Sequence, residues 1–274
     1  MSDLLSKKQQ QANGQIQHIT PENAQWEYVG FQAYLLKQGE RLTLNSEQNE
    51  LCFVFVAGKG NAVVDGQLFE QLGNRQTPFE RIPPYALYVP PHKQVNIEAT
   101  SDLELAVCSA PAIDGKLPVR VITPEEIGVE KRGVGNNQRL VHNILPETEP
   151  AERLLVVEVF TDEGNTSSYP SHKHDQKNSP NETYLEETYY HRFEPAQGFA
   201  LQRVYTDDRS LDESMAVYDK DVVKVPKGYH PVATIAGYNN YYLNVMAGPV
   251  RQWRFSWEEA HTWVNSAEYA EKFK

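Results

Sequence analysis

Residues 187–205, ETYYHRFEPAQGFALQRVY, decide the fold, because a stretch of similar character occurs earlier at residues 50–66, ELCFVFVAGKGNAVVDG. Each stretch opens with a glutamate and is rich in the apolar, aromatic and β-branched residues that favour strands. The opening glutamate lies 40 residues before Pro90 in the first copy and 39 residues before Pro226 in the second. Matched spacings indicate an internal repeat, so we predict a tandem duplication of one β-barrel or jelly roll.

The pattern of most of the remaining chain predicts short strands bounded by Gly, Pro, Asn and Asp. Sustained helical periodicity of apolar residues is scarce. The exception is the C-terminal tail, where Ser256 and Glu259 have the form of a capping box. Apolar residues then recur at helical spacing, which predicts a helix over 257–272 that packs its tryptophans on the body of the protein. The predicted fold class is all-β, with two tandem jelly-roll barrels and a C-terminal helix.

The same pattern predicts how the chain is divided. Residues 1–20 begin with a polar segment and are expected to form a flexible N-terminus. Residues 21–125 and 126–274 are expected to form an N-terminal and a C-terminal barrel. The boundary is placed there because residues 113–135 are rich in Pro, Gly, Glu and Lys.

Size and composition narrow the functional classes. The 274 residues include 40% hydrophobic and 23% charged residues, as in an ordinary globular protein. The net charge of −11 argues against nucleic acid as a partner. Cys52 and Cys108 each lie in an apolar run, so we expect two buried free thiols. No run is suited to a signal peptide or a membrane helix, and we expect a cytoplasmic protein without a membrane partner.

Two histidines stand two residues apart in SYPSHKHDQK, residues 168–177. On an extended strand His172 and His174 would face the same side and converge on one point. The neighbouring prolines, serines and lysines are equally typical of a solvated loop. Glu187 and His230 follow downstream, and three imidazoles with one carboxylate suit a divalent ion, with Zn²⁺ or Mn²⁺ preferred and Fe²⁺ also compatible.

The order His-x-His, Glu, Pro-x-Gly-x-His resembles the two short motifs of the cupin superfamily. In that superfamily two histidines and a glutamate come from the first motif and one histidine from the second. Two departures are visible. The gap from His174 to Glu187 is longer than usual, so a loop must bulge out between them, and Tyr229 alone separates Gly228 from His230.

The long gap leaves more than one candidate for the carboxylate ligand. Glu182, Glu186 and Glu187 all lie between the histidine pair and the strand-like run. We choose Glu187 because it starts that run and stands in phase with Tyr189 and His191, so that all three would face one side of a strand.

The first half of the repeat lacks most of this set. Glu50 occupies the place of Glu187, but no histidine occurs between His18 and His92. We therefore expect the N-terminal barrel to be cupin-shaped and without metal.

Longer stretches resemble the 5-deoxy-glucuronate isomerase family of bacterial myo-inositol catabolism, which is related to the pectin-pathway uronate isomerase. They are YLEETYYHRF (184–193), QGFALQRVYTDDRSLDE (197–213), VPKGYHPV (225–232) and, in the first half, ALYVPP (86–91). The resemblance implies a bicupin fold, a divalent metal, and interconversion of 5-deoxy-D-glucuronate and 2-deoxy-5-keto-D-gluconate. Thr166 stands where a tryptophan is expected.

Further residues are candidates for catalysis and substrate binding. An unperturbed histidine titrates near neutral pH, so His191, with Tyr189, is a candidate acid or base, although a histidine on a barrel face is often structural. A uronate carboxylate calls for a cation, and we choose Arg203 because arginine binds carboxylates with two parallel hydrogen bonds. The other candidates for the substrate pocket are Lys173, Arg192, Tyr229 and Tyr242.

The leading functional interpretation is a metal-dependent aldose–ketose isomerase that acts on a small sugar acid, by either an enediol route or a hydride shift. A cupin dioxygenase is an alternative, since three histidines and one glutamate also suit Fe²⁺. A non-catalytic sugar-binding cupin is the second alternative. Assembly into a homo-oligomer is left open.

Overall fold

The computed structural model describes residues 2–273. The chain forms two compact units, which are described separately. The N-terminal unit comprises residues 8–128 and 143–156, and the C-terminal unit comprises residues 2–7, 129–142 and 157–273. The boundary expected between residues 125 and 126 lies near the end of the first long segment, but each unit also takes a short segment from the other side of it.

Residues 2–20, which belong to the segment expected to be a flexible N-terminus, include two short strands. Within them lie β1 (Leu5–Ser6), which pairs with a strand of the C-terminal unit, and β2 (Gln15–Ile19), which belongs to the N-terminal unit. The Lys7 ammonium group is 2.7 Å from the Asp221 carboxylate. Because this aspartate is nearly buried, the ion pair helps to fix the first residues of the chain.

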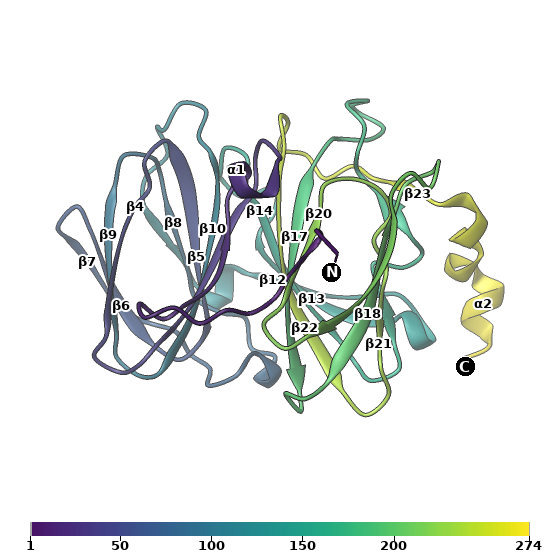
Figure 1. Ribbon diagram of the computed structural model, residues 1–274, viewed down its shortest axis with the longest axis horizontal. Coiled ribbons are helices and arrows are strands. Elements are labelled where there is room, and N and C mark those ends of the chain that lie inside the picture. The colour runs from purple at the N-terminus through teal and green to yellow at the C-terminus, as the bar shows by residue number, and fades with distance from the viewer. Residues whose placement is uncertain (1, 274) are drawn as a thin grey trace. The chain divides into compact units, whose positions relative to one another are not determined.

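The N-terminal unit contains two antiparallel sheets (Figure 1, purple to blue-green). The six-stranded sheet has the order β11 (Arg120–Ile122), β8 (Ala86–Val89), β5 (Asn49–Ala57), β10 (Leu103–Pro111), β3 (Gly30–Leu36), β2. The four-stranded sheet has the order β4 (Arg41–Asn45), β9 (Gln94–Ala99), β6 (Gly60–Val64), β7 (Gln67–Leu72). Both sheets contribute to one hydrophobic core, in which Phe53 and Phe55 of the first sheet and Val95 and Ile97 of the second are buried.

The C-terminal unit contains most of a seven-stranded sheet, a four-stranded sheet and a short strand pair. The seven-stranded sheet has the order β1, β20 (Val222–Val225), β17 (Glu186–Glu194), β22 (Asn239–Ala247), β14 (Leu155–Thr161), β13 (Arg139–Leu145), β12 (Gly128–Arg132). The four-stranded sheet has the order β15 (Thr166–Ser167), β21 (Val232–Thr234), β18 (Phe199–Tyr205), β19 (Asp212–Tyr218). The pair consists of β16 (His172–Lys173) and β23 (Ser256–Trp257).

The sheet orders confirm the predicted duplication. The series β8-β5-β10-β3 matches β20-β17-β22-β14, and β4-β9-β6-β7 matches β15-β21-β18-β19. The markers of the sequence repeat fall at equivalent places. Glu50 and Glu187 are the second residues of β5 and β17, while Pro90 and Pro226 directly follow β8 and β20. The architecture is therefore all-β, with two jelly-roll units of the same topology.

Glu50, the counterpart of Glu187 in the N-terminal unit, has a structural role. Its carboxylate accepts hydrogen bonds from the backbone N–H groups of Glu152, Arg153 and Leu154, at 2.6–2.8 Å, and from the hydroxyl of Tyr88. The side chain is completely buried. In this unit the glutamate therefore ties the segment 143–156 to β5 and β8.

Short helices are few. Besides the tail they are α1 (Pro21–Ala24), η1 (Pro78–Glu80), η2 (Pro124–Glu126) and η3 (Gly135–Asn137). Among the described residues, no helix is long and apolar enough to cross a membrane. Cys52 and Cys108 are buried free thiols, as predicted. They are paired across β5 and β10, and burial raises the pKa of the Cys52 thiol to about 12.

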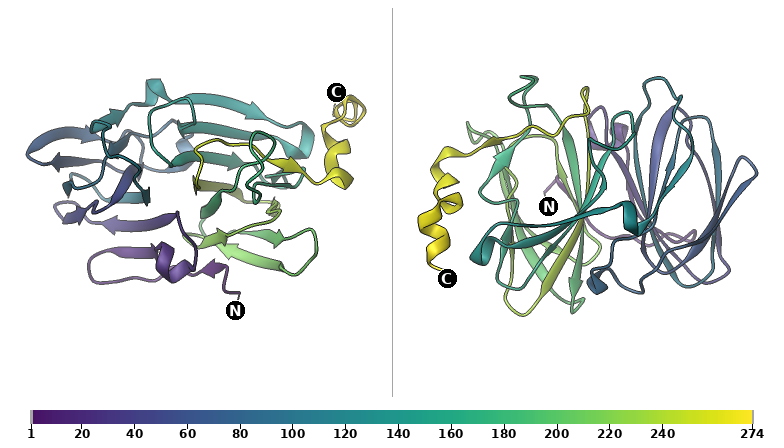
Figure 2. Two further views of the ribbon diagram at one scale, coloured as in Figure 1. Left: turned by 90° about the horizontal axis from the view of Figure 1, so that it is seen from above. Right: turned by 180° about the vertical axis from the view of Figure 1, so that it is seen from behind.

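The C-terminal tail is helical but begins later than predicted. Ser256 lies in β23, where it pairs with Lys173, so it cannot serve as the predicted N-cap. The tail instead contains η4 (Glu259–Asn265) and α2 (Ala267–Glu271), and the hydroxyl of Ser266 caps α2 by accepting from the N–H of Tyr269 (Figure 2, yellow). The prediction that the tail's tryptophans pack on the body is wrong for Trp263, which is 54% exposed.

Candidate functional site

The part of the stretch that holds the two histidines, residues 170–174, is buried and is not a solvated loop. His172 and Lys173 form β16, and His172 and His174 are 7% and 2% exposed. They meet His230, which follows the Pro-Lys-Gly turn after β20. One ring nitrogen of each of the three histidines lies within 4.8 Å of the others. Within residues 2–273, this is the one group of three or more histidine, cysteine or acidic side chains close enough to share an ion.

Glu187 completes the cluster. Its Oε2 atom lies 3.2 Å from the Nε2 atom of His174 and 3.2 Å from the Nε2 atom of His230. The other candidate carboxylates are used elsewhere. Glu182 accepts hydrogen bonds from the backbone N–H groups of Asp175 and Gln176, and Glu186 is the neighbour of Glu187 on the opposite face of β17.

Backbone carbonyl groups orient two of the rings. The Nδ1 atom of His174 lies 3.0 Å from the carbonyl oxygen of Leu185, and the Nδ1 atom of His230 lies 2.9 Å from that of Gly228. A carbonyl oxygen only accepts, so both Nδ1 atoms carry the proton and both Nε2 atoms turn toward Glu187. This outer contact is typical of histidines that bind a metal.

A positive charge at the centre of the cluster would remove an electrostatic repulsion between its members. In their neutral forms His174 and His230 turn Nε2 lone pairs toward a carboxylate oxygen, which is repulsive unless a cation or a proton lies between them. The buried Nε2 atom of His230 and the buried Nδ1 atom of His172 have no hydrogen-bond partner among residues 2–273. Such unpaired buried atoms are costly in a finished core. The donor set therefore fits a divalent ion.

Burial sets the charge state of the rings. It lowers the pKa of His230 to about 4, against the opposing effect of Glu187. It also lowers the pKa of His172 well below the usual value, and the other two histidines add to this. At His174 burial acts in the same direction, but the hydrogen bond and charge of Glu187 outweigh it and raise the pKa. Neutral imidazoles are the form that binds a metal ion.

The comparisons with known proteins identify the family. The model of the KduI/IolB family matches residues 4–264. The chain belongs to the KduI/IolB family. Two relatives named 5-deoxy-glucuronate isomerase are 55% identical (Geobacillus kaustophilus; 95% of this chain and 94% of the relative) and 48% identical (Bacillus subtilis strain 168; 96% and 99%). The family and these relatives make the chain an enzyme of the isomerase class.

Solved structures agree with the architecture. An IolB-like protein from Salmonella typhimurium LT2 is 63% identical, with a TM-score of 0.94 over 97% of this chain and 100% of that one. Oxalate decarboxylase of Lactobacillus farciminis, in a formate complex, is 14% identical, with a TM-score of 0.64 over 100% of this chain and 97% of that one. The second likeness concerns the fold alone, and it supports the all-β bicupin architecture of this KduI/IolB family member.

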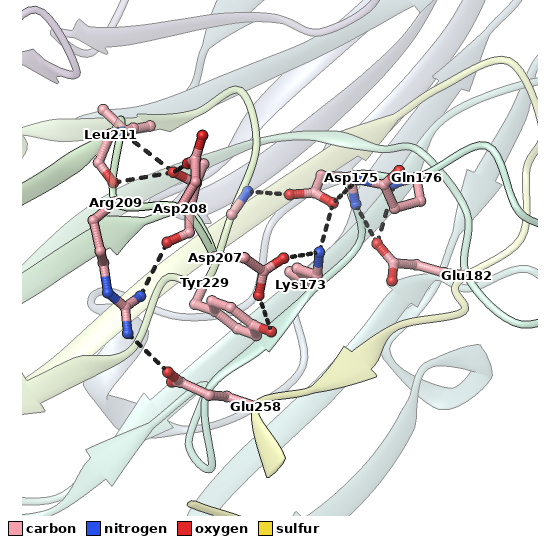
Figure 3. A network of polar contacts seen from close by, with 12 residues as sticks. Lys173, Asp175, Gln176, Glu182, Asp207, Asp208, Arg209, Leu211, Tyr229 and Glu258 are labelled. Atoms are coloured by element: carbon pink, nitrogen blue, oxygen red, sulfur yellow. Dashed lines mark hydrogen bonds and ion pairs between the residues drawn. The ribbon is translucent and has the colours of Figure 1, made fainter. Parts of the chain in front are cut away.

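A network of charged groups joins the two histidine-bearing segments (Figure 3). The ammonium group of Lys173 lies 2.6 Å from the Asp207 carboxylate and 3.3 Å from that of Asp175. The hydroxyl of Tyr229 donates to Asp207 at 2.9 Å, and the N–H of Gly228 donates to Asp175 at 3.0 Å. Lys173 and Tyr229, both predicted to contact substrate, are thus engaged in holding the residues beside His172, His174 and His230 in place.

Arg203 is not brought to the histidine cluster. Strand alternation turns Gln202 toward His191, so Arg203 lies on the other face of β18. Its Nε and Nη2 atoms donate to the two carboxylate oxygens of Asp212, at 2.7 and 2.6 Å. The guanidinium group that we expected to bind a substrate carboxylate is therefore already bound to an aspartate of the neighbouring strand, β19. Arg192 is similarly bound, with its Nε atom 2.8 Å from Asp219.

His191 lies in phase with Glu187 and Tyr189, as predicted, but both of its ring nitrogens are engaged. Nε2 lies 3.0 Å from the side-chain amide of Gln202, and Nδ1 lies 3.2 Å from that of Asn240. The ring is completely buried, and burial lowers its pKa to about 4. Contrary to the prediction of an acid–base role, a neutral ring held at both nitrogens has no free site for a substrate proton.

Tyr189 and Tyr242 lie closer to the metal-ligand candidates. The Tyr189 ring centroid is 5.7 Å from that of His230 and 5.0 Å from that of Tyr242. The Tyr189 hydroxyl lies 2.9 Å from that of Ser168. Burial, followed by the charge of Glu187, raises the pKa of Tyr189 well above its usual value, so the hydroxyl keeps its proton at neutral pH.

The sequence analysis missed the acidic residues that organise the site and one arginine. Asp175 directly follows His174, which is a local signal that was available. Asp207 lies in the loop after β18 and gives no comparable signal. Arg139, in β13, is distant in sequence from every ligand candidate, and only the sheet order brings it to this part of the unit.

Proposed function

We propose that this protein is a metal-dependent aldose–ketose isomerase that interconverts 5-deoxy-D-glucuronate and 2-deoxy-5-keto-D-gluconate in myo-inositol catabolism. The observation that carries the proposal is the meeting of His172, His174, His230 and Glu187 in a chain whose relatives are named 5-deoxy-glucuronate isomerase. We propose these four side chains as the ligands of one divalent ion, with Zn²⁺ or Mn²⁺ preferred and Fe²⁺ also compatible.

A bound divalent ion supplies Lewis-acid chemistry, which polarises a carbonyl group and lowers the pKa of a neighbouring hydroxyl. The chain's own residues would set the geometry around the sugar. Because its pKa is raised, the Tyr189 hydroxyl would act as a hydrogen-bond donor to a substrate oxygen rather than as a base. Ser168, 2.9 Å away, would hold that hydroxyl in a fixed direction.

Aromatic side chains would keep water from the reacting carbons. The ring centroid of Phe255 lies 4.8 Å from that of His172, and that of Trp257 lies 5.7 Å from it. Together with Tyr189 and Tyr242, these two side chains form an aromatic wall beside the histidine cluster. Exclusion of water serves both the enediol and the hydride-shift route, since each passes through a species that water would protonate or divert.

The decisive experiment is an anaerobic assay of the purified protein with 5-deoxy-D-glucuronate, followed by NMR. Loss of the aldose signals and growth of the ketose signals, abolished by a chelator and restored by a divalent metal, are expected. Oxygen-dependent consumption of the sugar would instead indicate a dioxygenase. Saturable binding without turnover in the presence of metal would indicate a sugar-binding cupin. A deuterium label at C2 would separate the two routes, since only the enediol route exchanges it with solvent.

A further inference from the structure

Arg139 is an arginine that forms no ion pair with an acidic side chain within residues 2–273. Its Nη1 atom donates to the backbone and side-chain oxygens of Asn137, both at 3.0 Å, and to the carbonyl of Tyr169 at 3.4 Å. Among the described residues no acidic side chain forms an ion pair with it, whereas Arg203 and Arg209 each pair with one. The residue is only partly exposed, and burial lowers the pKa of its guanidinium.

Strand alternation places Arg139 on the same face of the seven-stranded sheet as the substrate-pocket candidates. The ring of His142, on the same strand, packs against that of Phe160, which packs against that of Tyr241, so these three share one face. Arg139 is an odd number of residues from His142 and therefore lies on the opposite face. Tyr242 is likewise opposite to Tyr241, and it packs on Tyr189.

Local contacts agree with this placement. Tyr169, whose carbonyl accepts from Arg139, directly follows Ser168, and the Ser168 hydroxyl meets that of Tyr189. The positive charge of Arg139 also acts on the Tyr242 hydroxyl, where it opposes the rise in pKa that burial causes. The guanidinium therefore lies beside the tyrosines that flank the histidine cluster.

We propose that Arg139 binds the carboxylate of a uronic-acid substrate and so determines specificity for sugar acids over neutral sugars. This inference rests on the proposed function. An ionised substrate carboxylate would supply the charged partner that the acidic side chains of residues 2–273 do not provide, and arginine matches its two oxygens with parallel N–H donors. Arg139 thus takes the role that the sequence suggested for Arg203.

The test compares Arg139→Gln with Arg203→Gln, which makes the same change at an arginine bound to Asp212. For 5-deoxy-D-glucuronate, Arg139→Gln is expected to lower kcat/KM about tenfold to a hundredfold, mostly through KM. Arg139→Lys is expected to recover part of the loss, because lysine keeps the positive charge but cannot donate two parallel hydrogen bonds. Arg203→Gln is expected to retain wild-type kcat/KM.

A second substrate distinguishes recognition from a structural role. For 5-deoxy-D-glucose, which lacks the carboxylate, wild type and Arg139→Gln are expected to have the same low kcat/KM. Equal losses on both sugars, or a loss in Arg203→Gln in place of Arg139→Gln, would overturn the inference.

Binding of D-glucuronate and D-glucose, measured by calorimetry, separates this inference from the proposed function. If wild type binds the uronate in an Arg139-dependent manner but isomerises nothing, the proposed function fails and the inference stands. If wild type isomerises the uronate while Arg139→Lys and Arg139→Gln are unimpaired, the inference fails and the function stands.

Discussion

Glu187 Oε2 lies 3.2 Å from His174 Nε2, although the intervening chain leaves the site and returns. The loop between them is anchored by Glu182, whose carboxylate accepts the backbone N–H groups of Asp175 and Gln176. The side-chain carboxylate of Asp175 accepts a hydrogen bond from the N–H of Gly228, and this bond joins the same loop to the turn before His230. The insertion that departs from the usual cupin spacing is thus accommodated outside the cluster, and the proposed ligands still converge.

Replacing the histidine pair should remove the ion. We expect no more than one tightly bound divalent ion per chain and none in the double variant His172→Ala/His174→Ala, because two of four proposed ligands are lost. His18→Ala, at an exposed histidine of the N-terminal unit, serves as the control and should keep the ion. Elemental analysis after gel filtration is the measurement. Two ions in wild type, or one in the double variant, would contradict the assignment.

Removing the charge of Asp207 should weaken metal binding without touching a ligand. Asp207 holds Lys173 and Tyr229, the direct neighbours of the proposed ligands, so Asp207→Asn is expected to lower metal affinity about tenfold. Asp212→Asn makes the same change at a carboxylate that binds Arg203 and is the matched control. Competition with a chromogenic chelator measures the affinity. The idea fails if the two variants lose affinity equally.

Gly228 is expected to be irreplaceable in the turn before His230. It has φ of +88°, and a Cβ atom there would lie 2.4 Å from the carbonyl oxygen of Tyr205. Gly237 has φ of +87° with nothing within 4 Å of its Cβ position, so Gly237→Ala isolates the cost of the left-handed backbone.

We expect Gly237→Ala to lower the free energy of unfolding by about 1 kcal/mol, and Gly228→Ala by about 3 kcal/mol with weakened metal binding. Urea denaturation and chelator competition provide the two readouts. Similar stability losses in the two variants would show that Tyr205 moves aside at little cost.

The buried ring of His191 should make stability depend on pH. Its folded-state pKa is about 4, below the ordinary value of about 6.5, so the unfolded chain binds a proton between these pH values that the folded chain does not. Stability is therefore lost as the pH falls through this window. The groups at its nitrogens are the neutral amides of Gln202 and Asn240, and Asp221 is the charged group that opposes the shift.

Between pH 7.5 and 5 this residue should cost wild type about 2 kcal/mol of unfolding free energy, at about 1.4 kcal/mol per pH unit. His191→Gln keeps a polar side chain but does not titrate, so its stability should decline less over the same range. Urea denaturation of both proteins in matched buffers measures the difference. Parallel declines would mean that His191 is protonated equally in both states.

The sequence predicted best those features that depend on strand periodicity. Glu187, Tyr189 and His191 share a face of β17 because side chains alternate along any strand, and the repeat predicted two copies of one β architecture. The sequence could not predict which side chains of a neighbouring strand contact a given residue. Arg203 was chosen for its residue type, but the pairing of β18 with β19 places Asp212 next to it.

Competition between local and long-range contacts explains the other differences. The Ser256–Glu259 pattern is a valid local signal for a helix start, yet pairing of Ser256 with Lys173 takes precedence. Arg139 carries no local signal for a place in the site, since Tyr169, Tyr189 and Tyr242, which interact with it there, come from the segment before β16, from β17 and from β22. Pairing partners of this kind are fixed by tertiary packing and not by propensity.

The different use of Glu50 and Glu187 has a consequence for protein engineering. A designer who wished to copy the histidine cluster into the N-terminal unit would need more than three new histidines at the equivalent positions. The carboxylate of Glu50 already accepts three backbone N–H groups, so its transfer to a metal ion would leave those donors buried and unpaired. Glu50 has a structural role in the N-terminal unit. A metal site introduced there would therefore need an additional carboxylate ligand.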